Sequence, residues 1–473
     1  MQFAFNSSSI INVSNTLEVS MQHSLLRGIL IFVGFISLLI FPKTASQATE
    51  LDLPTQYDWR NDGYDFPVHD QGNCNAGYAF AAVDAVQAAI WKKDKVKVDF
   101  SVNHAKECNW HALTHYAGLP LNTCEGGNFK MLTNLFTQEG LVLENCDPYV
   151  DYDDSCSTRC VEEDATECMP KCSTTYYIKE WQQFSPNFEI APTDLIKQML
   201  KEHGPLYSQM DPKISGFSSY DGGYVLDSTS TDPNKWTHGV LIVGWDDDLS
   251  YTGGKGAWIV KNSYGTEWGN DGYFNIAYGK AGIGSSLATV TGWERNSVFN
   301  KIHFYDEAGH TNQISTSEKD FFSGSAMALF PIRSNEIPQA VEFWTNDAAT
   351  VSIELYELFD GIEPFNNLFQ SAEIDIPYTG YHQFKINENL KIPGNREIAV
   401  VLNVKNKSYF YPIALDHLGP LSSDKTWYKN ESGVWKSLPT WQGQNYEGTI
   451  RLRSLIIPEG LNHKVFLPIV SKK

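Results

Sequence analysis

Apolar residues recur at helical spacing just after position 77. Four of them share one helix face: Phe80, Val83, Val86 and Ile90. The polar residues 91–93 follow this face, so the pattern predicts a helix that begins near residue 77 and ends just past residue 90.

A second helical pattern lies between residues 194 and 203. Its apolar face consists of Leu195, Ile196, Met199 and Leu200. Thr193 is a suitable cap at the start, and Gly204 with Pro205 is a suitable stop, which predicts a helix with both ends marked.

Beyond residue 293 the pattern changes to short alternating or apolar runs between Gly, Asn and Pro turns. Examples are residues 351–355, 398–402 and 449–452. Such runs are typical of strands in an antiparallel sandwich. We therefore predict an α+β part followed by an all-β sandwich.

The first 48 residues have the pattern of a secretory leader. Arg27 precedes an apolar run at 29–41, and Pro42 and the small residues 44–48 follow. The run is shorter than the ~20 residues of a membrane span. Either Met1 or Met21 is the start. We expect a secreted or cell-surface protein, with membrane attachment only if the leader is an uncleaved anchor.

Charge and cysteine content narrow the function further. A net charge of −20 argues against nucleic acid or an anionic membrane surface as the partner. Eight cysteines in an exported chain favour up to four disulfides. The alternative of a zinc site fits the C-x₃-C spacing poorly. Its cysteines would be Cys156, Cys160, Cys168 and Cys172.

No metal or other cofactor is expected. The pair His111 and His115 is better explained as a solvated helix face than as a metal site. Several tryptophans of the predicted sandwich are candidates either for its core or for stacking on a sugar or peptide group: Trp344, Trp427, Trp435 and Trp441.

The segment 71–80 resembles the nucleophile segment of papain-family cysteine peptidases, whose pattern is C-G-[SA]-C-[WY]. Cys74 matches the first cysteine and Tyr78 the aromatic residue, but Gly77 stands at the nucleophile position. Other segments resemble the same family in the same order: residues 53–60, 67–72, 237–245 and 258–269.

The resemblance implies a role for each matching residue. His238 would be the base, Asn262 would orient its ring, and Gln71 with the amide of residue 77 would form the oxyanion hole. Gly126 and Gly127 would line the substrate cleft. It also implies a disulfide between Cys74 and Cys124, and one from Cys108 into residues 146–172. The connectivity of the remaining cysteines stays open: Cys146, Cys156, Cys160, Cys168 and Cys172.

The family fold implied is two-lobed, with Gly77 on a mostly helical lobe and His238 and Asn262 on a β-rich lobe. Residues 77 and 238 are further apart than the roughly 130–150 residues usual in the family, which predicts surface-loop insertions at 146–172 and 246–256. Residues 304–456 resemble the lectin-like sandwich of bacterial papain-family proteins. We thus expect a leader at 1–48, a papain-like domain at 49–296, a lectin-like domain at 297–457 and a tail at 458–473.

Glycine has no side chain that could attack a carbonyl. The leading hypothesis is therefore a catalytically defective peptidase homologue that holds a peptide or protein ligand in its cleft, while the sandwich binds glycan or protein. One alternative is residual hydrolysis through an activated water or through Cys74. Another is a non-catalytic surface or matrix scaffold.

Overall fold

The computed structural model describes residues 53–63, 67–109, 123–154, 156–157, 171–185, 189–297, 300–386, 390, 394–421, 424–438 and 446–458. The described residues, from 53 onward, belong to one compact unit. Several predicted features lie outside the described residues: the leader, His111, His115, Cys160, Cys168, Trp441 and most of the tail. Within the described ranges, no helix is both long enough and apolar enough to span a bilayer.

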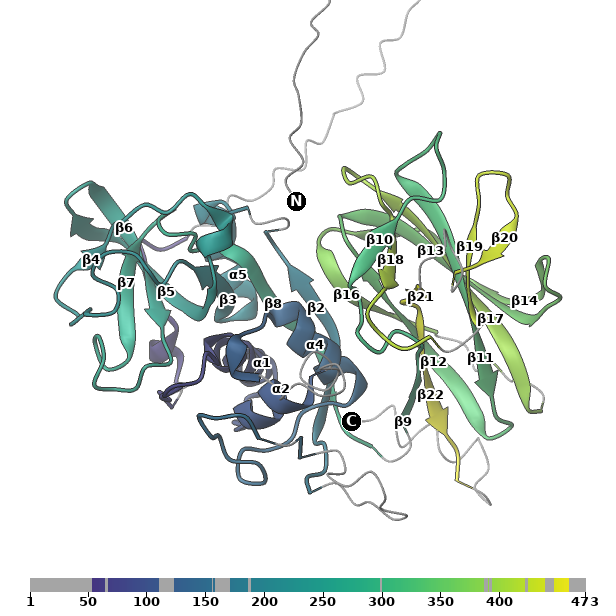
Figure 1. Cartoon of the computed structure of the whole chain (residues 1–473), viewed down its shortest axis with the longest axis horizontal. Coiled ribbons are helices and arrows are strands. Elements are labelled where there is room, and N and C mark those ends of the chain that lie inside the picture. Colours follow the sequence, from purple (N-terminus) through teal and green to yellow (C-terminus); the bar gives the residue numbers. More distant parts are fainter. Residues whose placement is uncertain are drawn as a thin grey trace, which may run out of the picture. The chain divides into compact units, whose positions relative to one another are not determined.

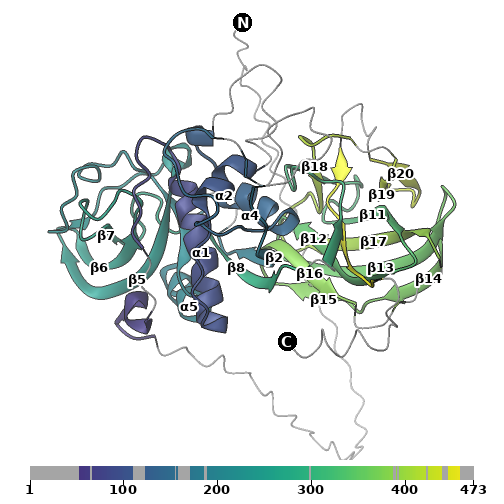
Figure 2. The same cartoon turned by 90° about the horizontal axis from the view of Figure 1, so that it is seen from below.

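The predicted first helix is present as α1 (Gly77–Asp94). Its residues 77–90 are buried on every side, so the apolar stripe seen in the sequence is only part of its contact surface. Figure 2 shows α1 along its length, with β5 (His238–Tyr251) and β8 (Ser285–Arg295) on either side. The other α-helices among the described residues are α2 (Val102–Cys108), α4 (Phe129–Gln138) and α5 (Thr193–His203), and α1, α2 and α4 lie close together (Figure 1). The part of the chain that the structure describes also has three short 3₁₀ turns: η1 (Trp59–Asp62), η2 (Thr123–Glu125) and η3 (Pro233–Lys235).

The second predicted helix is α5, and one detail of the prediction is wrong. Thr193 is the first helical residue, and the capping position belongs to Pro192, whose φ of −55° and ψ of 140° are extended. Proline fixes its own φ but has no side-chain oxygen that could accept from the free N–H groups of the first turn. The predicted stop is correct, since Gly204 ends the helix and its N–H donates to Leu200 O.

A twelve-stranded sheet runs through most of the unit, in the order β4-β7-β6-β5-β3-β8-β2-β16-β12-β22-β9, with β1 paired to β5. Besides β5 and β8, its strands are β1 (Gln56–Asp58), β2 (Tyr176–Gln183), β3 (Leu206–Met210), β4 (Val225–Leu226), β6 (Gly254–Lys261), β7 (Tyr273–Ala277), β9 (Asn300–His303), β12 (Glu336–Thr345), β16 (Thr379–Lys385) and β22 (Arg451–Ile456).

The predicted surface loop at 246–256 is mostly strand. β5 continues to Tyr251 and β6 begins at Gly254, so the segment is a β-hairpin in which Ser250 pairs with Lys255. Its Asp and Ser residues led to the loop prediction. They lie on an extension of the sheet that is partly exposed, where polar side chains are tolerated.

Two further sheets complete the predicted sandwich. One has seven strands, in the order β14-β13-β17-β11-β19-β20 with β15 paired to β13, and the other is the three-stranded β10-β18-β21. Their bounds are β10 (Asn312–Ile314), β11 (Ser323–Ile332), β13 (Ala349–Phe359), β14 (Pro364–Gln370), β15 (Ile374–Ile376), β17 (Arg396–Asn406), β18 (Ile413–Asp416), β19 (Thr426–Lys429), β20 (Trp435–Ser437) and β21 (Glu447–Gly448). Alternate residues of the strands fill a core that includes Phe330, Ile353 and Val400. On the opposite face, a smaller buried cluster forms around Trp435.

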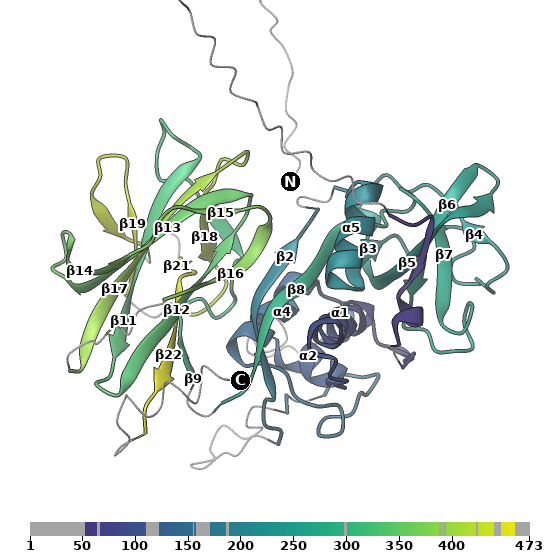
Figure 3. The same cartoon turned by 180° about the vertical axis from the view of Figure 1, so that it is seen from behind.

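The large sheet joins strands from both predicted parts of the chain. β2 pairs antiparallel with β16 through Gln183↔Thr379 and Tyr381↔Trp181. The two strands lie side by side in Figures 1 and 3. The rings of Trp181 and Trp344 pack edge to face nearby, with centroids 5.6 Å apart. The sequence predicted two structures in succession, and their strands instead share one set of hydrogen bonds.

A fully buried arginine reinforces this junction. The guanidinium of Arg451 on β22 forms a bidentate ion pair with Asp306, at 2.8 Å from Nε to Oδ1 and 2.6 Å from Nη2 to Oδ2. It also donates to Thr137 Oγ1 at 2.8 Å and Asn134 Oδ1 at 2.6 Å, both on α4. A buried charge must be neutralised and its donors must be satisfied, and this arrangement does both.

We predict that Arg451→Met destabilises the protein by about 3–5 kcal/mol, because Asp306 is left as an uncompensated buried charge. The measurement is urea unfolding. The control Arg60→Met removes the exposed pair with Asp58 and is expected to cost at most about 1 kcal/mol. Replacing Asp306 by Leu in the Arg451→Met background should recover part of the loss. A cost below about 1 kcal/mol for Arg451→Met would contradict this account.

Candidate active site

His238 and Gly77 meet where the first residue of β5 packs on the first residue of α1. A Cβ added to Gly77 would lie 2.6 Å from Cε1 and 2.8 Å from Nδ1 of His238. The imidazole therefore occupies the space that a side chain at position 77 would need. His238 itself is buried, with 7% of its surface exposed.

The close contact is possible because the residue after the histidine is also a glycine. A Cβ at Gly239 would lie 2.6 Å from the Cα of Tyr78, which is backbone and has no freedom to move aside. Any larger residue at 239 would push β5 away from α1. Gly239 thus sets the distance between His238 and the start of the helix.

Asn262 follows β6 directly and orients the imidazole. His238 Nε2 lies 2.8 Å from Asn262 Oδ1. An amide oxygen only accepts hydrogen bonds, so Nε2 carries the proton and the unprotonated Nδ1 is directed at position 77. Tyr264 packs against the same ring, with centroids 5.3 Å apart.

Burial lowers the pKa of His238 below its ordinary value of 6.5, and the hydrogen bond that its Nε2 donates to Asn262 offsets this only in part. The imidazole is therefore neutral near pH 7. In this state it is a base, and it supplies no positive charge to stabilise an anion.

Gln71 also lies at the site, but its side-chain amide is held by the protein. Its Nε2 donates to Cys74 O at 2.7 Å, and its Oε1 accepts from Ser263 Oγ at 2.7 Å. The backbone adds a third link, from Gln71 N to Ser263 O at 2.8 Å. Ser263, next to Asn262, was not identified from the sequence because a serine in that segment has no signature of its own.

The two predicted cleft glycines differ in their surroundings. A Cβ at Gly127 would lie 2.4 Å from Cε2 of Tyr78, whereas a Cβ at Gly126 would have nothing within 4 Å. Gly126 has a φ of +113°, a conformation that disfavours other residues. The glycine pair thus lets the chain turn close to α1 while one side of it faces open space.

The cysteines that the structure describes are all in disulfides. Cys74 is bonded to Cys124, the pairing that the resemblance implied, and Cys74 is fully buried. Cys108 is bonded to Cys156 within the 146–172 segment. The third bond joins Cys146 to Cys172. Two sulfurs of the run considered for zinc, those of Cys156 and Cys172, are therefore used elsewhere.

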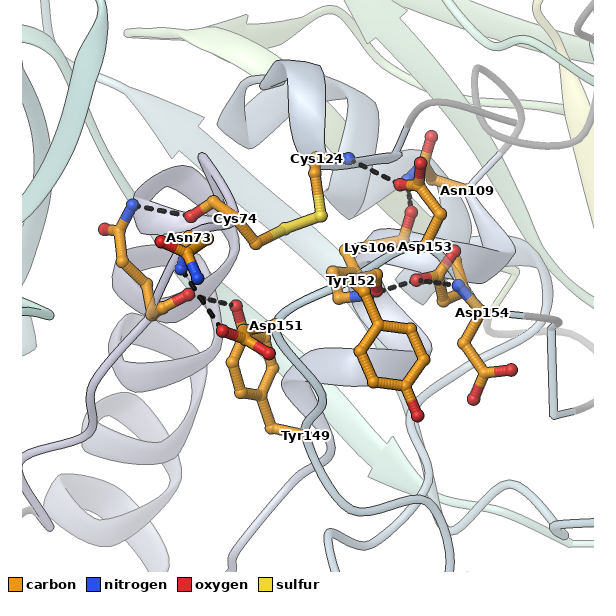
Figure 4. Close-up of a disulfide and its surroundings, with 12 residues drawn as sticks. Asn73, Cys74, Lys106, Asn109, Cys124, Tyr149, Asp151, Tyr152, Asp153 and Asp154 are labelled. Carbon is orange, nitrogen blue, oxygen red and sulfur yellow. Dashed lines mark hydrogen bonds and ion pairs between the residues drawn. A yellow bond between two sulfur atoms is a disulfide. The ribbon is translucent and has the colours of Figure 1, made fainter. Parts of the chain in front are cut away.

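The described part of the 146–172 segment does more than cover the surface. Asp151 accepts from Asn73 N at 3.3 Å and Asp153 accepts from Cys124 N at 3.0 Å, so one carboxylate binds each side of the Cys74–Cys124 disulfide (Figure 4). Tyr149 OH donates to Gln71 O at 2.9 Å. These residues hold the loop before α1 in place, a role that their acidic composition did not reveal.

A buried ion pair connects the helix to the strand that leads to Asn262. Lys261 Nζ on β6 lies 2.5 Å from Asp84 Oδ2 on α1, and both side chains are almost fully buried. The pair therefore joins α1, which begins at Gly77, to β6, which Asn262 follows. It was missed in the sequence because the two residues are far apart in the chain.

Comparison with known proteins finds matches for both parts of the chain. Residues 53–291 match the model of the papain family cysteine proteases, and residues 302–448 match that of a lectin like domain. Procathepsin L of Felis catus is 29% identical over 231 residues, which cover 48% of this chain and 61% of that protein. Cathepsin L2 of Homo sapiens is 30% identical over 234 residues, covering 49% of this chain and 62% of that protein. The chain thus spans less than two thirds of the length of these relatives.

Solved structures with both parts are also similar. The clostridial cysteine protease Cwp84 after propeptide cleavage superimposes with a TM-score of 0.69 at 18% identity, over 85% of this chain and 99% of that one. The cysteine protease and lectin-like domains of Cwp84, a surface layer associated protein of Clostridium difficile, give 0.66 at 17% identity, over 85% and 89%. At this identity the likeness establishes the shared fold. With the family model matching residues 53–291, the chain belongs to the papain family of cysteine proteases.

Proposed function

We propose that this protein is an exported, catalytically defective papain-family protein that binds extended peptide in its cleft without cleaving it. In this proposal Gly77 replaces the nucleophilic cysteine. The sandwich binds a second partner, either glycan or protein. A leader at 1–48 and disulfides, which form in oxidising compartments, support export to the cell surface or beyond.

The observation that carries the proposal is the contact between Gly77 and His238. In a cysteine peptidase the histidine accepts the thiol proton and the resulting thiolate attacks the substrate. Here Nδ1 of His238 is directed at a residue that has no proton to give. Removing the nucleophile of a comparable triad lowers turnover by a factor on the order of 10⁶.

The two substitute nucleophiles considered from the sequence gain no support from the geometry. Cys74 has no thiol, because its sulfur is bonded to Cys124, and it is buried. A water held in place of the missing side chain would need the space beside Gly77, and the ring of His238 already fills it, at 2.6 Å from an ideal Cβ. We therefore favour binding over residual hydrolysis.

Features that suit peptide binding remain at the site. Gly126 faces open space. A glycine has no side chain to keep another backbone away, so an extended peptide could approach closely there. Gly127, the next residue, lies against Tyr78 at the start of α1. A scaffold with a vestigial cleft would lack such binding, so direct measurement separates that alternative from the proposal.

We predict that Gly77→Cys gains peptidase activity on a fluorogenic peptide library, whereas the wild type shows none. In a comparable triad the nucleophile raises turnover by a factor on the order of 10⁶. The gain from Gly77→Cys should be much smaller, because the imidazole must first rotate away from the new Cβ. Gly77→Ala imposes the same steric change without a thiol and should stay inactive. Activity in the wild type that is lost in His238→Ala would support the hydrolase alternative.

We predict that fluorescent peptides from the same library bind the wild-type protein and are not cut. Binding is measured by fluorescence anisotropy, and intact peptide is verified by mass spectrometry after the measurement. Placing a bulky side chain at the open glycine, in Gly126→Trp, should weaken binding at least about tenfold by blocking the cleft. The same change at exposed Gly361 in the sandwich is the control. Absence of binding to every peptide would favour the scaffold alternative.

We predict that His238 titrates below pH 6.5 in the folded protein, because burial disfavours the imidazolium. The unfolded state then binds more protons in the interval between the folded pKa and 6.5. Stability from this group is therefore complete above pH 6.5 and is lost as the pH falls through that interval. NMR of ¹³C-labelled histidine measures the pKa, with the urea-unfolded protein as reference. A folded pKa at or above 6.5 would refute the prediction.

A further inference from the structure

The outer face of the seven-stranded sheet carries a row of polar side chains. On β11, β13 and β17 every second residue enters the core, and the residues between them face outward. Ser325 and Ser352 are both direct cross-strand neighbours of Asn403. All three are partly exposed, whereas further along the same face Met327, Leu329, Ala399 and Val401 are buried together with Trp435. The open part of the face is therefore the end that carries the polar row.

Hydrogen bonds hold these side chains in fixed positions. Ser325 Oγ donates to Asn403 Oδ1 at 2.6 Å, and Asn403 Nδ2 donates to Ser352 Oγ at 3.2 Å and to Glu354 Oε1 at 2.9 Å. Hydroxyl, amide and carboxylate groups thus stand in a preset order across three strands. Preorganised polar groups lose little conformational entropy when a ligand binds.

The row lines a hollow of about 580 Å³. A second hollow of about 420 Å³ adjoins it, and the two share Thr316, Ser317, Asn430 and Glu431. Together they form one groove, which is polar at the end over the sheet. We refer to it as the sandwich groove.

The other end of the sandwich groove has an aromatic rim. Phe321 and Tyr411 line it and are 43% and 44% exposed. Phe410, 51% exposed, packs against Phe321 with centroids 5.8 Å apart. Large apolar side chains gathered in the open beside polar groups mark interaction sites. Of the tryptophans considered from the sequence, Trp344 and Trp435 are buried, so they do not contribute to this surface.

The combination fits a sugar chain better than a peptide. A sugar ring has an apolar C–H face that packs on an aromatic ring, and hydroxyls that pair with hydroxyl, amide and carboxylate groups. A peptide that adds a strand needs an unpaired sheet edge. β11 is paired with β17 along its whole length and with β19 at residues 326–328, so beside the groove only residues 323–325 leave an edge, which is short for an added strand.

We propose that the sandwich groove binds an oligosaccharide, with the rings of Phe321 and Tyr411 packing on sugar rings and the Ser325–Asn403–Ser352 row pairing with sugar hydroxyls. This inference rests on one element of the proposed function, namely that the sandwich binds a second partner. It is independent of the cleft at Gly77.

The test is binding of the full-length protein to a glycan array, followed by calorimetry with the best-bound soluble oligosaccharide. The double variant Phe321→Ala, Tyr411→Ala should bind at least about tenfold more weakly, and so should Asn403→Ala. The matched control is Phe365→Ala, which removes an aromatic side chain of similar exposure, 41%, that lies outside both hollows. Unchanged thermal unfolding verifies that each variant is folded.

Binding to no glycan on the array, or equal weakening by Phe365→Ala, would overturn the proposal. Binding of a peptide array that is lost in the double variant would also overturn it and would identify the groove as a protein site. Neither result bears on peptide binding at the cleft near Gly77, because that binding is tested separately with the Gly126→Trp variant. Failure of the cleft function and failure of the oligosaccharide site are therefore distinguishable.

Discussion

The packing of β5 on the first turn of α1 determines the geometry of the candidate active site. The backbone of Gly239 touches the backbone of Tyr78, so the neighbouring residues His238 and Gly77 must also meet. Backbone contact of this kind cannot be adjusted by side-chain rotation. The remaining groups are placed relative to it, since Asn262 binds the imidazole from one side and Ser263 binds Gln71 from the other.

The supporting structure around this contact has been kept at some energetic cost. The Lys261–Asp84 pair buries two charges between α1 and β6, and buried charges are stable only when they are well paired. Two carboxylates fix the backbone on both sides of the Cys74–Cys124 disulfide. These contacts hold the start of α1, Gln71 and Asn262 in fixed positions relative to one another.

The sequence predicted the elements with strong local signals and missed those that depend on distant contacts. The helix from Gly77 and the strands around Ile353 and Val400 were predicted because their periodicity is local. The 246–256 hairpin was missed because its composition is that of a loop. The papain-like and lectin-like fold was predicted correctly from motifs. The β2–β16 pairing and the contacts of Arg451 were not, because nothing near either residue in the chain indicates its partner.

The shared sheet bears on how this protein can be dissected. A cut between the two segments that match family models, 53–291 and 302–448, would separate β2 from β16 and expose a strand edge on each fragment. Unpaired edges recruit other strands and promote aggregation. One fragment would also retain Asn134 and Thr137 without the guanidinium that they bind. The limits of the two family matches are therefore poor places to divide the chain for expression.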